Sequence, residues 1–195
     1  MKMGMRGCFG VNRRRYGGGL ALLWYACVTV HIQSYSPSHI DAHVFQDDGV
    51  SRCFTGFYGH PKTALRYLSW ALLLSFHALS DKPWMVLGDF NEILALKEKQ
   101  GCEDKSFHQM AGFRDVLANC SLMDFGFLGP EFTWSNRRED DDLVRVQLDR
   151  GLATSEWKLL FPNSNVRYLI IANSNHLCLL VDLASGTVLV RRKKG

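Results

Sequence analysis

Short apolar runs separated by turn-forming residues dominate the first half of the chain. Runs of this length, bounded by Gly, Ser-Pro or Asp-Asp-Gly, are typical of strands. The expected strands are residues 20–24, 27–33, 41–45 and 51–57, and a run that begins at Trp84 after a break at 81–83. We therefore expect the first half to supply much of a β-sheet.

Apolar positions spaced by three and four residues predict two helices. The first opens at Pro61, and its expected inward stripe is Leu65, Leu68, Leu72, Phe76 and Leu79. The second begins near Ser106, which has capping-box spacing with Gln109. Its expected inward face is Met110, Phe113 and Leu117.

The second half of the chain returns to strands. Val144, Val146 and Leu148 alternate as a strand that delivers Asp149, after a charged hairpin tip at 137–142. Residues 166–171 and 177–183 are expected strands around a polar loop at 173–176. Strands outnumber helices, and helices come singly between pairs of strands, which predicts an α/β sandwich with helices outside two facing sheets. No repeat or linker is visible, so residues 1–195 are predicted to form a single domain.

Composition adds few constraints. The 195 residues are 47% hydrophobic and 22% charged, as in ordinary globular domains. The net charge of +4 permits a nucleic-acid partner but is lower than in most dedicated DNA-binding modules. We expect the basic cluster at 13–15 to be a solvated loop, and the one at 191–194 to belong to a disordered basic tail, residues 184–195.

Cysteine usage and hydropathy indicate an intracellular protein of the nucleus or cytoplasm. The six cysteines include no C-x-x-C pair, which argues against a zinc ribbon, and their dispersal fits reduced thiols. The longest mostly apolar stretch, residues 20–30, spans 11 residues, whereas a membrane-crossing helix needs about 20. We expect no membrane association, no secretion and no obligate protein partner.

The candidate chemistry follows the apolar run at Trp84. Gly88 permits a bend, and Asp89 and Asn91 can face the same way on extended backbone. A carboxylate can orient and deprotonate a water, and an amide can donate to a phosphoryl oxygen, so the pair suits phosphoester hydrolysis. A buried strand that ends in an Asp-Asn turn would produce the same pattern.

A second group of candidate ligands lies earlier in the chain. His39, Asp41 and His43 alternate, so they could share one face of a strand as metal ligands would. No fourth ligand is indicated, and we therefore do not expect a metal there.

Five short motifs stand in the order seen in the endonuclease/exonuclease/phosphatase superfamily, which the chain resembles. They are TGFYGHP (55–61), WMVLGDFNEIL (84–94), FTWSN (132–136), QLDR (147–150) and SNH (174–176). The chain looks most like the endonuclease-like domains of plant non-LTR (LINE-type) retroelements, also through residues 17–24 and 113–127. The resemblance spans about residues 10 to 183. It implies a four-layered α-β-β-α sandwich of two mainly antiparallel sheets, with the motif loops along one rim.

The resemblance implies catalytic roles for five residues. Asp89 would position or activate the attacking water, and Asn91 would brace that carboxylate and the phosphate. Tyr58 would lie beside the scissile phosphate, although from the residues alone it could be an ordinary aromatic at a strand end. His176 would be the catalytic histidine, and Asp149 would hold its tautomer and support its positive charge.

The resemblance also implies a substrate-binding rim and a cation. Thr133, Trp134 and Asn136 would line the rim, although Trp134 could equally be a core residue. The implied cofactor is Mg²⁺ or Mn²⁺, and the implied partner is DNA.

Departures from the family pattern bear on activity. The expected N-terminal Asn motif and metal-binding Glu should precede residue 17, but residues 1–16 contain no Glu or Asp. We expect the first strands to be missing, leaving an exposed strand edge and an apolar face. The family's Ser-Asp-His reads Ser174-Asn175-His176, so Asn175 is a degenerate metal position, and Gln147 replaces an Arg expected near the scissile phosphate. Because Mg²⁺ prefers anionic oxygen ligands, binding should be weak.

Three functions are compatible with the sequence. The first is a metal-dependent DNA endonuclease by ancestry, with little or no activity in this chain. The second is a non-catalytic remnant that retains nucleic-acid binding. The third is a lipid or nucleotide phosphatase of the same superfamily.

Overall fold

The computed structural model describes residues 5–12, 19–46, 49–101, 105–171 and 174–183. The predicted basic loop at 13–15 and the predicted tail at 184–195, including its cluster at 191–194, lie outside these ranges. All the residues expected to form the site are described, from Tyr58 to His176.

A six-stranded sheet forms the centre of the fold, in the order β3-β4-β5-β6-β11-β8. Its strands are β3 (Thr29–Ser36), β4 (His39–Phe45), β5 (Ser51–Tyr58), β6 (Trp84–Asp89), β8 (Met123–Asp124) and β11 (Asp149–Ala153). Only β5 and β6 pair in parallel among these neighbours. A parallel pair needs a long crossover, which is supplied by η1 (Thr63–Leu65) and α1 (Arg66–Leu79).

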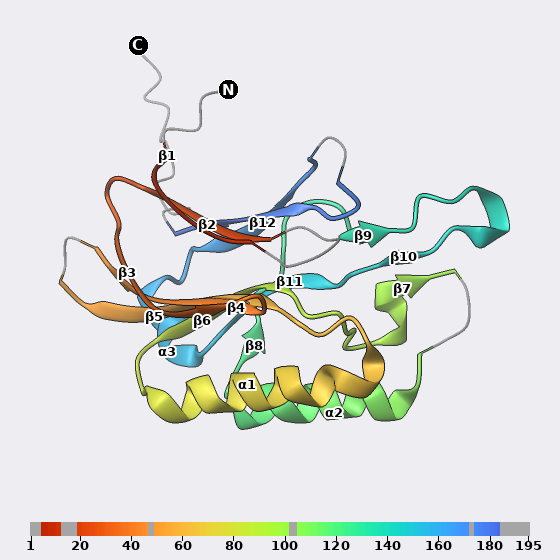
Figure 1. The fold of residues 1–195 in the computed structure, drawn as a ribbon, viewed down its shortest axis with the longest axis horizontal. Coiled ribbons are helices and arrows are strands. Elements are labelled where there is room, and N and C mark those ends of the chain that lie inside the picture. Colours follow the sequence, from red (N-terminus) through yellow and green to blue (C-terminus); the bar gives the residue numbers. More distant parts are fainter. Residues whose placement is uncertain (1–4, 13–18, 47–48, 102–104, 172–173, 184–195) are drawn as a thin grey trace, which may run out of the picture.

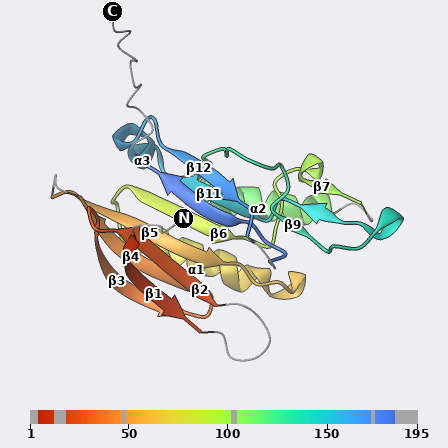
Figure 2. The ribbon, with the colours of Figure 1, turned by 90° about the horizontal axis from the view of Figure 1, so that it is seen from above.

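Helices and smaller sheets cover the two faces of this sheet. Helices α1 and α2 (Phe107–Asn119) lie side by side against one face (Figure 1). Two ribbons lie against the other face, over different parts of the sheet (Figure 2): β1 (Met5–Val11) with β2 (Leu20–Tyr25), and β12 (Asn165–Leu169) with β13 (Cys178–Asp182). The predicted α/β class, with facing sheets and outer helices, is confirmed.

Shorter elements complete the fold. A three-stranded sheet has the order β7-β10-β9. These elements are β7 (Lys99–Gln100), β9 (Trp134–Ser135), β10 (Arg145–Val146), α3 (Ser155–Leu160), η2 (Leu96–Glu98) and η3 (Asp140–Asp142). The predicted hairpin tip at 137–142 connects β9 to β10, which pair in antiparallel fashion.

The core has a layer on each side of the central sheet. The layer under the helices includes Phe57, Leu73, Phe90 and Phe113, all with no exposed surface. The layer under the β12–β13 ribbon contains Met85, Trp157, Val166 and Tyr168 among its buried members. Together these layers fix the ends of β5, β6 and β11, where the candidate site lies.

The predicted inward stripe of the first helix is partly wrong. Leu68 and Leu79 are 50% and 80% exposed, whereas Ser69 and Leu73 are buried. The helix carries apolar residues on almost every side, so periodicity alone could not identify the inward face. Ser69 faces inward because its hydroxyl accepts the His60 N–H at 2.8 Å.

Other local predictions differ in detail. In α2, Met110, Phe113 and Leu117 are buried as predicted, but Ser106 makes no side-chain capping bond. The strand predicted to run through residues 144–149 is divided into β10 and β11. Residues 5–11, for which no strand was predicted, form β1.

The two ribbons do not pair with each other. Strand β2 packs over β4 and β5, and β13 packs over β11, so β6 lies between them in the underlying sheet order. In the described part of the chain, β2 pairs only with β1 and β13 only with β12. The inward residues Leu22, Trp24 and Leu179 are only half-buried, which leaves the core above β6 thinly covered.

Further sequence features have clear places in the fold. Cys53 and Cys120 are buried free thiols in the core under the helices. His39 shares one face of β4 with Asp41 and His43, and its ring contacts the Ser34 and Ser36 hydroxyls. Across the described ranges, no helix has the length and apolar character needed to span a membrane.

Candidate active site

Three neighbouring strands bring polar side chains to one edge of the central sheet. Tyr58 and Asp89 end the parallel strands β5 and β6 at matching positions. Asp149 begins the antiparallel strand β11 directly opposite Asp89. Sheet register therefore places these three predicted residues together, although they are far apart in the sequence.

The loop after β6 fixes the orientation of the Asp89 carboxylate. Asn91 has a left-handed backbone with φ of 54°. Its backbone N–H donates to Asp89 Oδ1 at 2.7 Å, and its side-chain amide donates to Asp89 Oδ2 at 3.0 Å and to the Gly59 carbonyl at 2.9 Å. Asn91 thus braces Asp89, while both of its amide hydrogens are engaged within the protein.

His176 reaches the same edge from the segment before β13. Its ring Nδ1 lies 3.0 Å from Asp149 Oδ2, and its Nε2 lies 4.0 Å from Asp89 Oδ2. The His176 side chain is 36% exposed, whereas those of Asp89 and Asp149 are 8% and 7% exposed. A partly exposed imidazole between two buried carboxylates can meet a ligand from solvent.

Burial and charge shift the ionisation of this group. Burial raises the pKa of Asp89 to about 7, with a further contribution from Asp149, and the opposing effect of His176 is smaller. Burial lowers the pKa of His176, but its hydrogen bond to Asp149 and the charges of Asp149 and Asp89 outweigh that effect and raise it. The arrangement favours a protonated imidazole and disfavours two charged carboxylates without a cation.

The same residues have the composition of a cation site. One potential ligand atom from each of Asp89, Asp149 and His176 lies within 4.8 Å of the other two. No other group of three His, Cys, Asp or Glu residues this close occurs in the described ranges. Asn175, the predicted degenerate metal position, is exposed beside His176.

The predicted rim residues are mostly occupied by contacts within the protein. Thr133 is 1% exposed, and Trp134 is half-buried against the cluster of Ile93, Met110 and Val146. Asn136 donates to the Asp142 carbonyl at 2.7 Å and accepts N–H groups from residues 138 and 144, so it spans the β9–β10 hairpin.

Position 147 was expected to lie beside the scissile phosphate, but Gln147 lies inside the protein. It is 6% exposed, and its amide nitrogen donates to the Tyr168 hydroxyl at 3.4 Å inside the protein. That hydroxyl donates in turn to the Asp149 carbonyl at 2.8 Å. The predicted loss of a positive charge at position 147 is therefore a change beneath the site.

Sequence reasoning missed a buried ion-pair network beside the motif. Glu92 is 1% exposed and accepts hydrogen bonds from Arg66 and, at 2.7 Å, from Lys105. It ties the loop after Asp89 to the start of α1 and the approach to α2. Its position directly after the Asp-Phe-Asn triplet was the only signal available in the sequence.

A second buried network supports Asp149. Arg150 has no exposed surface and donates to Glu98 at 2.6 Å and to Asp124 at 2.8 Å. Burial alone would lower the pKa of Arg150, but its hydrogen bonds and charges with Glu98 and Asp124 raise it. Arg150 is therefore a buried cation held by two carboxylates, directly below the site.

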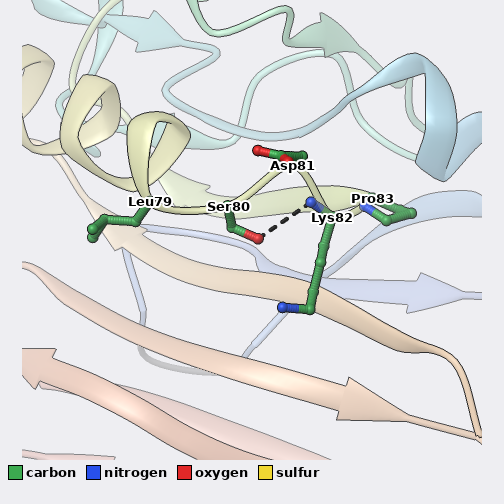
Figure 3. A pocket seen from close by; sticks show the side chains of 5 residues that line it. All are labelled: Leu79, Ser80, Asp81, Lys82 and Pro83. Atoms are coloured by element: carbon green, nitrogen blue, oxygen red, sulfur yellow. Dashed lines mark hydrogen bonds between the residues drawn. The ribbon is translucent and has the colours of Figure 1, made fainter.

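A pocket in the described part of the chain lies away from the site. A pocket of about 470 Å³ is lined by residues 79–83 after α1, where the Lys82 N–H donates to the Ser80 hydroxyl at 3.2 Å (Figure 3). It lies at the start of β6, whereas Asp89 lies at the end of that strand. The candidate site therefore lies at the other end of β6 from this pocket, on a rim where the His176 side chain is partly exposed.

Comparisons by sequence alone find nothing similar: no protein-family model matches the chain, and no curated protein matches it significantly.

Comparisons of the fold give clear matches. The endonuclease domain of TRAS1, a telomere-specific non-LTR retrotransposon, matches with a TM-score of 0.67 and 14% identity, over 92% of this chain and 80% of that chain. The 3′ phosphatase NExo from Neisseria, bound to a product DNA hairpin, matches with a TM-score of 0.61 and 16% identity, over 92% and 79%. An endonuclease/exonuclease/phosphatase family protein from Bacteroides thetaiotaomicron matches with a TM-score of 0.55 and 16% identity, over 91% and 74%.

The chain therefore has the fold of endonuclease/exonuclease/phosphatase proteins. At these identities the likeness shows the fold, and a fold alone does not fix a function.

Proposed function

We propose that this fold serves here as a DNA phosphodiesterase domain of retroelement origin, whose hydrolytic activity is weak. The observation that carries the proposal is the convergence of Asp89, Asp149 and His176 at one edge of the sheet, with the imidazole between the carboxylates. The TRAS1 endonuclease domain, with the highest TM-score of the structures named above, supports a retroelement lineage.

Each residue has a distinct chemical task in this proposal. Asp149 holds the His176 ring and favours its charged form, so that His176 can donate to a phosphoryl oxygen or leaving group. Asp89, oriented by Asn91, aligns a water and accepts its proton; a carboxylate with a pKa near 7 suits a general base at neutral pH. Tyr58, which is partly exposed and pairs with Asp89 in the sheet register, would contact the phosphate in this proposal.

The donor set fits a divalent cation with modest affinity. Asp89 presents a carboxylate oxygen, whereas the Asp149 oxygen nearest the ring is engaged with His176 Nδ1 and a protonated Nε2 offers no lone pair to a cation. When bound, a cation would neutralise negative charge on the phosphate. Mg²⁺ demands near-ideal octahedral geometry and loses its waters reluctantly, so a site with one available carboxylate disfavours it relative to Mn²⁺. This is the reason to propose weak Mg²⁺ binding and low turnover.

DNA is the proposed substrate because exposed cations flank this rim. Arg137 donates to the Ser174 carbonyl beside His176, and Arg138 and Arg145 are exposed on the same β9–β10 hairpin. Such arginines can contact phosphates without reading base sequence. A 3′-phosphatase activity is the second candidate, because a DNA-bound 3′ phosphatase shares the fold.

Nicking of supercoiled plasmid by purified protein tests the proposal. We expect slow, cation-dependent nicking, faster with Mn²⁺ than with Mg²⁺, and lost in Asp89→Asn and His176→Gln; general acid or base groups typically contribute about 100- to 10,000-fold. Exposed His108→Gln is the matched control. A parallel assay with a 3′-phosphorylated oligonucleotide separates the phosphatase candidate.

Two results would contradict the proposal. Robust Mg²⁺-dependent nicking would overturn the predicted weakness. Salt-sensitive DNA retention without any cleavage would instead indicate a non-catalytic remnant, since phosphate contacts alone give that behaviour.

A further inference from the structure

We propose that Thr133 is a positioning residue that sets the Asp149–His176 contact, and that it does not touch substrate. This role rests on the proposed function, because the contact matters for catalysis only if the two side chains act together. Thr133 lies one residue before β9 and bonds to backbone groups on both sides of the site.

Thr133 holds Asp149 through its side chain. The hydroxyl oxygen accepts the Leu148 N–H and the Asp149 N–H, each at 2.9 Å. Leu148 is the residue before β11, and Asp149 is the first residue of that strand. One hydroxyl therefore fixes the position at which Asp149 enters the sheet. The Tyr168 hydroxyl, which donates to the Asp149 carbonyl at 2.8 Å, fixes the other side of the same residue.

Thr133 holds the His176 segment through its main chain. Its carbonyl accepts the Leu177 N–H at 3.0 Å, and its own N–H donates to the Val146 carbonyl at 3.1 Å. The adjacent Trp134 forms a β-bridge with His176. Thr133 is therefore bonded both to Asp149 and to the residue that follows His176.

Burial separates this role from substrate contact. Thr133 is 1% exposed, and its oxygen already accepts two N–H groups. A hydroxyl in this situation cannot reach a phosphate, but its removal would leave two buried N–H groups without an acceptor. The Asp149 backbone would then be free to shift relative to the imidazole.

Titration of His176 measures the role directly and needs no turnover. The His176 resonance can be assigned among the seven histidines with His176→Gln. In Thr133→Val, which keeps the shape but lacks the hydroxyl, we expect the pKa of His176 to fall toward the value of about 6.5 for a free imidazole. In Thr133→Ser, which restores the hydroxyl, we expect the wild-type titration.

Thr154→Val is the matched control. Thr154 is also buried, and its hydroxyl accepts the Trp84 N–H at 3.2 Å just beyond the opposite end of β11. This variant loses a comparable hydrogen bond, so we expect it to lose stability without a change in the His176 titration. A folded Thr133→Val with an unchanged His176 titration would overturn the role.

If Thr133→Val does not fold, amide hydrogen exchange of the wild-type protein tests the positioning role of Thr133. The Leu148, Asp149 and Leu177 amides should then exchange slowly, since all three are bonded to Thr133. Exchange of these amides at the rate of an open chain would refute the role. An inactive protein that still shows the expected titrations would refute the proposed activity and leave the positioning role supported.

Discussion

Asp89 and Asp149 are directly opposed across the antiparallel strands β6 and β11, so two buried carboxylates meet at the end of a sheet. Opposed like charges are unfavourable in a sheet. The pair is tolerated because Asn91 bonds to one carboxylate and the His176 ring contacts the other. Because the two carboxylates repel each other, the stability of the protein should respond to pH and to cations.

Stability without added cations should fall as pH rises from 5 to 8. The folded-state pKa of Asp89 is about 7, above the unfolded value of about 3.9, so the folded state holds this proton more tightly and loses that advantage between the two values. The raised pKa of His176 acts in the same direction. Urea unfolding in chelator should show a decrease on the order of a few kcal/mol.

Asp89→Asn is the test of that assignment. The variant removes the acid but keeps one oxygen to accept the Asn91 N–H, so its stability should depend less on pH. Asp141→Asn, at an exposed position in η3, should follow the wild-type curve. If the free energy of unfolding depends equally on pH in Asp89→Asn and in the wild type, the pH dependence does not come from Asp89.

Divalent cations should stabilise the protein more at pH 8 than at pH 6. A cation must displace the proton of Asp89, whose pKa is about 7, and ligand binding to the folded state adds about 2.7 kcal/mol at 100-fold excess over Kd. Thermal unfolding should show a larger shift with Mn²⁺ than with Mg²⁺, and none in Asp89→Asn. An undiminished shift in that variant would place the bound cation at another site.

Asn175→Asp should strengthen cation binding without restoring efficient turnover. The position is exposed beside His176, so the substitution adds a third carboxylate at the rim and should change stability by less than about 0.5 kcal/mol. Thermal shifts with Mn²⁺ and the plasmid assay measure the two effects separately. Full recovery of nicking would mean that the Glu expected before residue 17 is dispensable.

Glu92→Gln should destabilise the fold by about 3–5 kcal/mol, the usual cost of breaking a buried ion pair. It leaves Arg66 and Lys105 without their shared carboxylate. Asp182→Asn disrupts the exposed Arg167–Asp182 pair and should cost at most about 1 kcal/mol. Urea unfolding at pH 7 compares the two, and equal losses would show that burial of the first pair is unimportant.

Gly88→Ala should disrupt the strand pairing that delivers Asp89. Gly88 has φ of 156°, and an added Cβ would lie 1.9 Å from the Phe57 carbonyl oxygen. Gly112→Ala in α2 should have the opposite effect, because a Cβ there meets nothing within 4 Å. This substitution should stabilise the protein by about 0.4–1 kcal/mol. Thermal unfolding of the two variants should therefore shift in opposite directions.

The sequence predicted local features better than long-range ones. Turn residues and apolar runs located β2 to β6, since those signals lie within a few residues of each strand. Periodicity misjudged Leu68 and Leu79, because an almost wholly apolar helix has no polar face to mark the outside. No strand was predicted for residues 5–11, whose pairing with β2 depends on tertiary structure.

The candidate site shows the same limit. The contact between Asp89 and Asn91 was predicted, but from extended backbone, whereas β6 ends at Asp89 and Asn91 lies in a turn with φ of 54°. The contact of Asp149 with His176 joins residues 27 positions apart and was expected only from family resemblance. Thr133 and Gln147 were assigned to the surface because residue type does not reveal burial. Their roles became visible only through the groups to which they bond.

Because the two ribbons are separate, the contact between Asp149 and His176 depends on how the β12–β13 ribbon packs on the central sheet. Asp149 belongs to the central sheet, whereas His176 leads into the β12–β13 ribbon, which shares no backbone pairing with the β1–β2 ribbon in the described ranges. A ribbon of two strands can open at lower free energy than a whole domain unfolds. Each such opening would separate the imidazole from its carboxylate, so any strand that paired with β13 on the side away from β12 would lengthen the time for which the site is assembled.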